Sequence, residues 1–170
     1  GAKVSDKLGA IRNLLPRVDA VVIGGGMAYT FLSVLGVSIG RSLFEADMVD
    51  EARAILEEAR ALGRALLLPV DSVCAASLDD PARACVIEGD LPEDLMGLDI
   101  GPASAGAAAE VLRDAKTVIW NGPMGVFETP PFDAGSRAVA DAIVDATAHG
   151  AISVIGGGET AAAIESFGHA

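Results

Sequence analysis

Four short apolar runs, each followed at once by glycine or a polar residue, constrain the fold of this chain most strongly. They are DAVVI at 19–23, ALLLPV at 65–70, TVIW at 117–120 and AISVI at 151–155. None shows a regular alternation of polar and apolar residues, which is typical of strands that helices cover on both faces. The sequence therefore predicts four buried, parallel strands.

Helical patterns of the right length for crossovers lie between these runs. The clearest spans 46–62, where apolar residues recur at three- and four-residue steps and Gly63 follows as a C-cap. A similar stripe runs from Leu8 to Val18, and further helices are expected over 104–115 and 134–147. The alternation predicts an α/β fold, a doubly wound, mostly parallel sheet with helices on both faces, forming one domain over 1–170.

Composition excludes several classes of protein. The 170 residues carry 12 basic and 24 acidic side chains, a formal charge of −12, which repels polyanions and argues against nucleic-acid binding. Two cysteines are too few for a disulfide framework. No apolar run approaches the roughly 18 residues of a membrane span. We expect a soluble, cytoplasmic protein that does not bind membranes.

Ligands of such folds bind at the carboxyl ends of the strands. Two of the four predicted strands end in triple glycines, at 24–26 and 156–158. Such a turn lets a ligand approach the backbone and can point free N–H groups at an anion. A single triple glycine is equally well explained as a tight turn. Two of them at equivalent places favour a phosphate-bearing ligand.

Two lysines stand four residues apart at the start of the first predicted helix. Lys3 and Lys7 repel each other there and oppose the positive end of the helix dipole. A bound polyphosphate would reverse that penalty, whereas a solvated, fraying helix start would tolerate it. From spacing alone both interpretations remain open.

The segment WNGPMGVFE at 120–128 follows the third apolar run. Turn chemistry explains its glycines and proline but does not require Trp120, Asn121 or Glu128. An asparagine can orient a phosphate or a sugar hydroxyl, and a glutamate can accept hydrogen bonds from ribose hydroxyls. The segment is a candidate nucleotide contact.

Other mechanisms find little support. The sequence has no Walker loop, no G-x-S-x-G elbow and no His-x-x-x-His pair. One rival is an NAD-binding oxidoreductase domain, because Gly156, Gly158 and Ala161 match the G-x-G-x-x-A fingerprint. That motif normally opens the first βαβ unit, whereas here it lies in the last. A scaffold in which the glycines are only structural is the third hypothesis.

Six ordered blocks resemble phosphoglycerate kinase, specifically its nucleotide-binding C-terminal domain. They are GAKVSDK at 1–7, IGGGMAYTF at 23–31, LLLPVD at 66–71, MGLDIGP at 96–102, TVIWNGPMGVFE at 117–128 and VIGGGET at 154–160. The resemblance covers essentially the whole chain. It implies a Rossmann-like three-layer domain that binds Mg-ADP or Mg-ATP. The whole enzyme would transfer a phosphoryl group between 1,3-bisphosphoglycerate and ADP in glycolysis, as a monomer.

The resemblance also implies roles for individual residues. Lys3 and Lys7 would neutralise the phosphates, and the amides of Gly157 and Gly158 would face the transferred phosphoryl group. Asn121 would help to seat the phosphates, and Glu128 would hold the ribose. The adenine slot would consist of Gly1, Ala2, Gly25, Gly26, Leu43, Leu78, Gly97, Leu98 and Pro123. Gly125, Val126, Gly156, Glu159 and Thr160 complete the expected nucleotide contacts.

Two departures from the family's pattern qualify these expectations. Glu159 stands where the family usually has Asp, at the position expected to hold the nucleotide's Mg²⁺. The extra methylene moves the carboxylate, and Mg²⁺ tolerates little distortion of its octahedron. The phosphoglycerate-binding N-terminal domain and a further Gly-rich segment after Ala170 are expected to be missing. The fragment alone should then bind nucleotide with little or no transfer activity.

Overall fold

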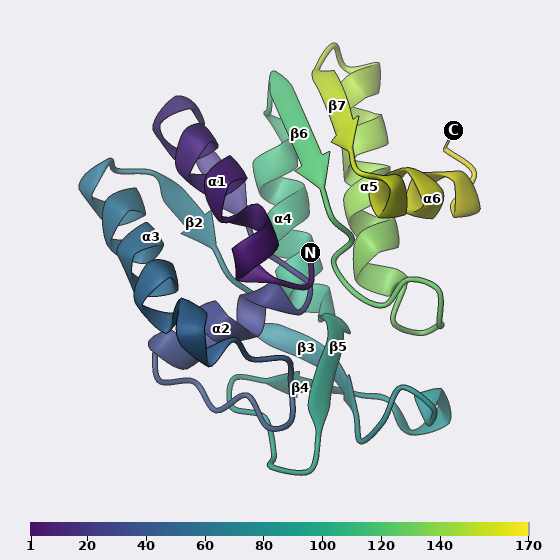
Figure 1. Ribbon diagram of the computed structural model, residues 1–170. Coiled ribbons are helices and arrows are strands. Elements are labelled where there is room, and N and C mark those ends of the chain that lie inside the picture. Colours follow the sequence, from purple (N-terminus) through teal and green to yellow (C-terminus); the bar gives the residue numbers. More distant parts are fainter. Residues whose placement is uncertain (170) are drawn as a thin grey trace.

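The computed structural model describes residues 1–169 and forms one α/β domain (Figure 1). The first half contains α1 Val4–Leu14, β1 Ala20–Val22, α2 Met27–Val34, α3 Val49–Ala61 and β2 Ala65–Leu67. The middle contains β3 Asp71–Ala75, β4 Cys85–Glu88 and β5 Met96–Ile100. The last part contains α4 Pro102–Arg113, β6 Thr117–Asn121, α5 Ala134–Ala148, β7 Ile152–Gly156 and α6 Gly158–Ser166, and short 3-10 turns span Leu15–Arg17, Ala46–Met48 and Pro81–Arg83.

The four apolar runs form strands that pair in parallel as predicted, but the prediction that all four are buried is wrong, because β6 alternates between buried and exposed residues and β7 is mostly exposed. β1 pairs with β2, and β6 pairs with β7. Val118 and Trp120 of β6 are buried against α4 and α5. The second run gives a strand that ends at Leu67, before Pro69, whose ring nitrogen cannot donate to a neighbouring strand. The fold class predicted from the sequence is confirmed.

The arrangement of the sheet adds two features that the sequence did not reveal. The parallel strands form two separate pairs within residues 1–169, and a three-stranded antiparallel sheet, β4–β3–β5, lies beside them. Tyr29 and Leu32 of α2 pack on the antiparallel sheet around Cys74. Since Met27, Ala28 and Phe31 of the same helix pack with Ile23 beside β1, α2 joins the parallel part of the molecule to this sheet.

The helices begin and end close to the predicted positions, for identifiable reasons. Over 46–62, a 3-10 turn precedes α3, which ends before Gly63 with its φ of +66°. α4 starts two residues earlier than expected because Pro102 suits the first helical position. α1 stops at Leu14, and a 3-10 turn containing Pro16 follows.

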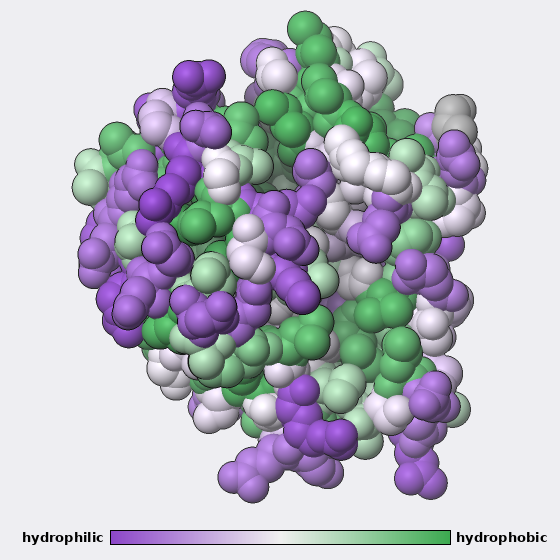
Figure 2. Space-filling model, viewed as in Figure 1, coloured by the Kyte–Doolittle hydropathy of each residue, from purple (hydrophilic) through white to green (hydrophobic). Residues whose placement is uncertain are grey.

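One face of the β6–β7 pair is apolar and open. Ile119, Ile152 and Val154 are 51%, 67% and 50% exposed. Figure 2 shows a hydrophobic patch over these two strands. Within residues 1–169, no helix is long and apolar enough to span a bilayer.

The two cysteines should differ sharply in reactivity. Cys74 on β3 lies opposite Cys85 on β4, yet Cys74 is fully buried and Cys85 is exposed. Burial raises the pKa of the Cys74 thiol to about 12, so little reactive thiolate forms there. We expect Ellman's reagent to modify Cys85 in the native protein and Cys74 only after denaturation. Equal reaction rates for both thiols in the native state would contradict this burial pattern.

Candidate functional site

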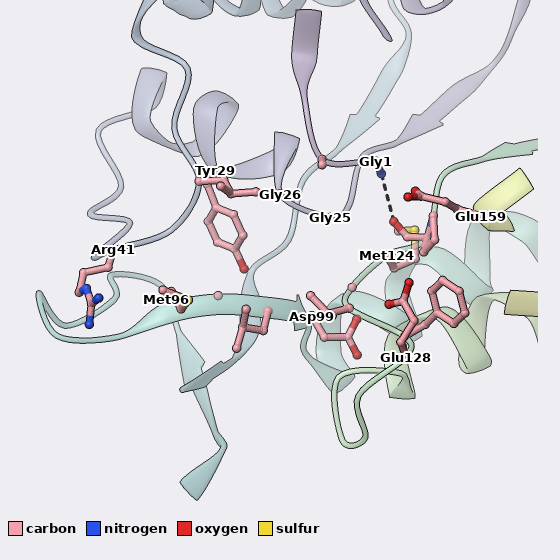
Figure 3. A pocket seen from close by; sticks show the side chains of 18 residues that line it. Gly1, Gly25, Gly26, Tyr29, Arg41, Met96, Asp99, Met124, Glu128 and Glu159 are labelled. Atoms are coloured by element: carbon pink, nitrogen blue, oxygen red, sulfur yellow. Dashed lines mark hydrogen bonds between the residues drawn. The ribbon is translucent and has the colours of Figure 1, made fainter. Parts of the chain in front are cut away.

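A cavity of about 240 Å³ lies where six segments of the chain converge (Figure 3). Besides the loop between α2 and α3, these are the chain start, the turn after β1, strand β5, the loop after β6 and the first turn of α6. Three of them follow directly on strands β1, β6 and β7. The cavity therefore lies at the edge of the parallel strands where ligands of α/β folds bind.

The first triple glycine holds three segments in close contact. Gly25 has a φ of +76°, and a Cβ placed there would lie 2.4 Å from the Gly1 oxygen and 3.0 Å from the Pro123 oxygen. Its amide donates to Met124 O at 3.0 Å, and the amide of Met27 donates to Gly1 O at 3.1 Å. These N–H groups are used inside the protein, so this turn shapes the cavity wall instead of presenting those amides to an anion.

The loop after β6 is held by two buried hydroxyl groups. Thr160 on α6 accepts from the amide of Gly122 at 2.8 Å, and Ser136 on α5 accepts from the amide of Met124 at 2.8 Å. The Trp120 indole donates to Gly122 O at 2.9 Å. Thr160 is only 1% exposed. The structure therefore places Thr160 beneath the loop, as a support, where the sequence predicted a nucleotide contact.

A second group of predicted residues meets beside the cavity, at the start of α6. Lys7 Nζ donates to Asn121 Oδ1 at 2.5 Å. A Cβ at Gly157 would lie 3.3 Å from the same oxygen, so the second glycine turn packs against Asn121. Gly158, the first residue of α6, has open space where a Cβ would be. The first-turn amides of a helix lack intrahelical partners, and here a cation and such a helix start both lie beside Asn121.

The start of α1 is capped by a residue that the sequence did not indicate. Glu45 accepts from the amide of Val4 at 2.6 Å and from the Ser5 hydroxyl at 2.6 Å. This carboxylate satisfies the helix start, so α1 does not offer its N-terminus to a phosphate. Lys3 lies just before the helix with an exposed side chain. Lys7 therefore has the stronger geometric connection to the site.

Two buried titratable groups contribute to the cavity walls. Tyr29 donates to the Ser72 hydroxyl at 2.9 Å, and burial raises the pKa of the phenol. Asp99 is 2% exposed, and burial raises the pKa of its carboxyl to about 7. Hydrogen bonds from the amides of Gly135 and Ile100 oppose that rise.

Most residues predicted for the adenine slot line this one cavity. Leu78 is the member of that predicted slot that does not line it. Of the residues predicted to contact the phosphates or Mg²⁺, Glu159 lines the cavity, whereas Lys3, Lys7, Asn121, Gly156, Gly157, Gly158 and Thr160 do not. The predicted residues that do line it are Gly1, Ala2, Gly25, Gly26, Leu43, Gly97, Leu98, Pro123, Gly125, Val126, Glu128 and Glu159.

The structure also adds lining residues that sequence reasoning missed. Met124 and Phe127 lie inside the WNGPMGVFE segment, Tyr29 inside GGGMAYTF, and Met96 and Asp99 inside MGLDIGP. The motifs thus pointed to the right segments but not to these side chains. Arg41 also lines the cavity, but it lies outside all of the recognised motifs, so the sequence did not indicate it.

Glu159 presents a single carboxylate to the cavity from the first turn of α6. No cluster of three or more His, Cys, Asp or Glu side chains suited to a metal occurs among residues 1–169. A lone carboxylate fits a Mg²⁺ that arrives coordinated by substrate phosphates, because that ion commonly uses one or two carboxylates and keeps its waters.

Comparison with known proteins decides the family. The family model for phosphoglycerate kinase matches residues 1–170. The chain belongs to the phosphoglycerate kinase family. It is 53% identical over 169 residues to the phosphoglycerate kinase of Corynebacterium jeikeium and 50% identical over 168 residues to that of Lactobacillus acidophilus. These alignments cover 99% of this chain but only 41% and 40% of the relatives.

Solved structures of phosphoglycerate kinase agree with the fold. The structure from Coxiella burnetii superposes with a TM-score of 0.95 at 40% identity, covering 99% of this chain and 43% of that one. The structure from Pyrococcus horikoshii gives 0.81 at 32% identity, covering 98% and 42%. The matched family model, the two relatives and the two solved structures are all phosphoglycerate kinases, so these comparisons do not favour an NAD-binding oxidoreductase domain.

Proposed function

We propose that this chain binds Mg-ADP and Mg-ATP as the nucleotide half of a phosphoglycerate kinase. The observation that carries the proposal is the meeting of Lys7, Asn121 and the open start of α6 beside a glycine-walled cavity. A cation and unpartnered amides suit the phosphates, and the neighbouring apolar cavity suits a purine. Family membership supports the same assignment.

The cavity walls suit a flat aromatic ligand. Gly25, Gly26 and Gly97 contribute backbone without side chains, and Leu43 and Leu98 contribute apolar contacts. Adenine in this space would place the ribose near Glu128, whose carboxylate can accept from two hydroxyls. The phosphates would then extend toward Glu159 and α6.

The proposed reaction is phosphoryl transfer between 1,3-bisphosphoglycerate and ADP. Its transition state spreads negative charge over the transferred group, so stabilisation is chiefly electrostatic. Lys7 would supply positive charge, and the Gly157 and Gly158 amides would donate to the phosphoryl oxygens. Mg²⁺, when bound with the nucleotide, would neutralise phosphate charge, and Glu159 would be its protein ligand.

Transfer itself needs a second substrate, phosphoglycerate or its acyl phosphate. The chain spans about two-fifths of the length of the curated relatives it matches. We propose that the remaining part of such a protein holds phosphoglycerate and closes onto the nucleotide, excluding water. Residues 1–170 alone would then bind nucleotide with little or no transfer activity.

Replacing Lys7 with alanine tests the phosphate assignment. Hydrogen bonds to charged groups contribute about 1.5–3 kcal/mol, so we expect Mg-ADP affinity to fall roughly 10- to 100-fold in calorimetry. Lys116→Ala is the matched control, because Lys116 is an exposed lysine just before β6, at the opposite end of that strand from Asn121. Unchanged affinity in the Lys7 variant would remove its assigned role. Absence of nucleotide binding to the unaltered chain would overturn the proposed function.

A further inference from the structure

Asp99 places a buried carboxylate at the junction of two cavity walls. One oxygen, Oδ2, accepts from the amide of Gly135 in the first turn of α5 at 2.7 Å. The other, Oδ1, accepts from the amide of Ile100 at 2.8 Å. The first bond joins β5 to a segment 36 residues further along the chain. Asp99 therefore ties β5 to the start of α5.

The space around this carboxylate is closed by two glycines. A Cβ added to Gly125 would lie 2.4 Å from Asp99 Oδ1, and one added to Gly135 would lie at the same distance. Next to this contact, the amide of Val126 donates to Leu98 O at 2.9 Å. Leu98, Gly125 and Val126 all line the cavity, so this contact between β5 and the loop lies in its wall. Figure 3 shows Asp99 on β5 beside the loop that carries Glu128.

We propose that Asp99 is a positioning residue for the nucleotide: its ionised carboxylate fixes the 123–128 loop and the start of α5 against β5, and thereby holds the cavity wall that β5 and this loop form together. This inference rests on the proposed function, because it names a determinant of that same site. Asp99 acts through Gly135 and Gly125, and it is not assigned a direct role in the chemistry.

The ionised form is the one that satisfies both amides. A carboxylate accepts at both oxygens, whereas a protonated carboxyl carries a hydrogen on one of them and weakens one of the two bonds. The groups that face Asp99 add little positive charge. Asp133 precedes α5 and is paired with Arg137, Tyr29 reaches across from α2, and Glu128 lies on the neighbouring loop. Desolvation by burial is the largest cause of the raised pKa of Asp99, about 7, and the charge of Asp133 adds to it.

The test compares the pH dependence of binding in three forms of the full chain. In the unaltered protein we expect affinity for adenosine and for Mg-ADP to rise about tenfold from pH 6 to pH 8. In Asp99→Asn, we expect affinity to be nearly independent of pH and about tenfold weaker than the unaltered protein at pH 8. Asp133→Asn is the matched control, which keeps the rise and lowers its midpoint. Adenosine carries no phosphate that titrates in this range, so its arm isolates the protein.

A second measurement needs no variant. The amide signal of Gly135 in NMR spectra of the unaltered protein should titrate with a midpoint near 7, and saturating adenosine should move that midpoint to lower pH. If adenosine leaves the midpoint of the Gly135 titration unchanged, the inference is overturned. It is also overturned if the unaltered protein and Asp99→Asn bind adenosine with equal affinity at pH 8. Those outcomes leave the proposed function intact. Failure of the unaltered chain to bind any adenine nucleotide overturns the proposed function itself.

Discussion

Replacing Gly25 with alanine is expected to lower the free energy of unfolding by about 3 kcal/mol, measured by chemical denaturation. The left-handed backbone conformation costs an alanine roughly 1–2 kcal/mol. The added methyl would also press on the backbone at Gly1 and Pro123, which cannot yield as a flexible side chain would. Overpacking of this kind costs about 1–3 kcal/mol. Since this turn forms a cavity wall, Mg-ADP binding should weaken with it.

Gly63→Ala separates the two contributions. Gly63 has a similar φ of +66°, but no atom lies within 4 Å of the position that its Cβ would take. We therefore expect this variant to lose only about 1 kcal/mol, the conformational part, with nucleotide binding unchanged. Equal losses in the two variants would show that the close approach of Gly25 to the chain start has no energetic role.

Replacing Asp71 with alanine is expected to cost about 3 kcal/mol of stability. Asp71, at the start of β3, is 3% exposed and accepts from the amides of Ala103 and Ser104, both at 2.9 Å. It also accepts from the Ser104 hydroxyl at 2.5 Å. These amides belong to the first turn of α4, so a distant strand caps this helix. Each buried donor left without a partner costs about 1–3 kcal/mol.

The matched control is Asp80→Ala. Asp80 is a surface residue whose Oδ2 lies 3.6 Å from Nε of Arg83. Water screens the attraction between these two exposed charges. Its removal should change stability by no more than about 0.5 kcal/mol. A loss as large as that of Asp71→Ala would mean that the effect comes from charge and not from capping. A loss below 1 kcal/mol in Asp71→Ala itself would mean that α4 finds another cap.

The parallel strands were predictable because each is a local apolar run with a sharp end. The antiparallel sheet was not, because its strands carry no such signal. β3 begins with Asp71 and Ser72, both buried and both satisfied by partners far along the chain. β4 is mostly exposed, and β5 contains Gly97 and the buried Asp99. Polar residues that are buried only through long-range hydrogen bonds look like loop residues in the sequence.

The same distinction applies to the site. Glycine turns and the lysine spacing can be recognised from neighbouring residues, and most of the predicted adenine contacts line one cavity. Glu45, which caps α1, lies 41 residues away from Val4 in the chain, and no spacing rule connects the two. Thr160 follows the second glycine turn and so resembles a ligand contact, yet the fold turns its hydroxyl inward to Gly122. The resemblance to a known family identified the segments that surround the cavity. The direction in which individual side chains such as Thr160 point could be seen only in the tertiary structure.

The hydroxyls of Ser136 and Thr160 have a mechanical consequence. They hold two amides of one short turn, and each belongs to a different helix. A ligand that draws α6 toward itself would therefore act on this turn through Thr160, while Ser136 on α5 holds the Met124 end. Contacts to the phosphates and to the adenine of one nucleotide would thus be coupled through a single hydroxyl group, and a Thr160 variant without that hydroxyl would let the two ends of the ligand bind independently.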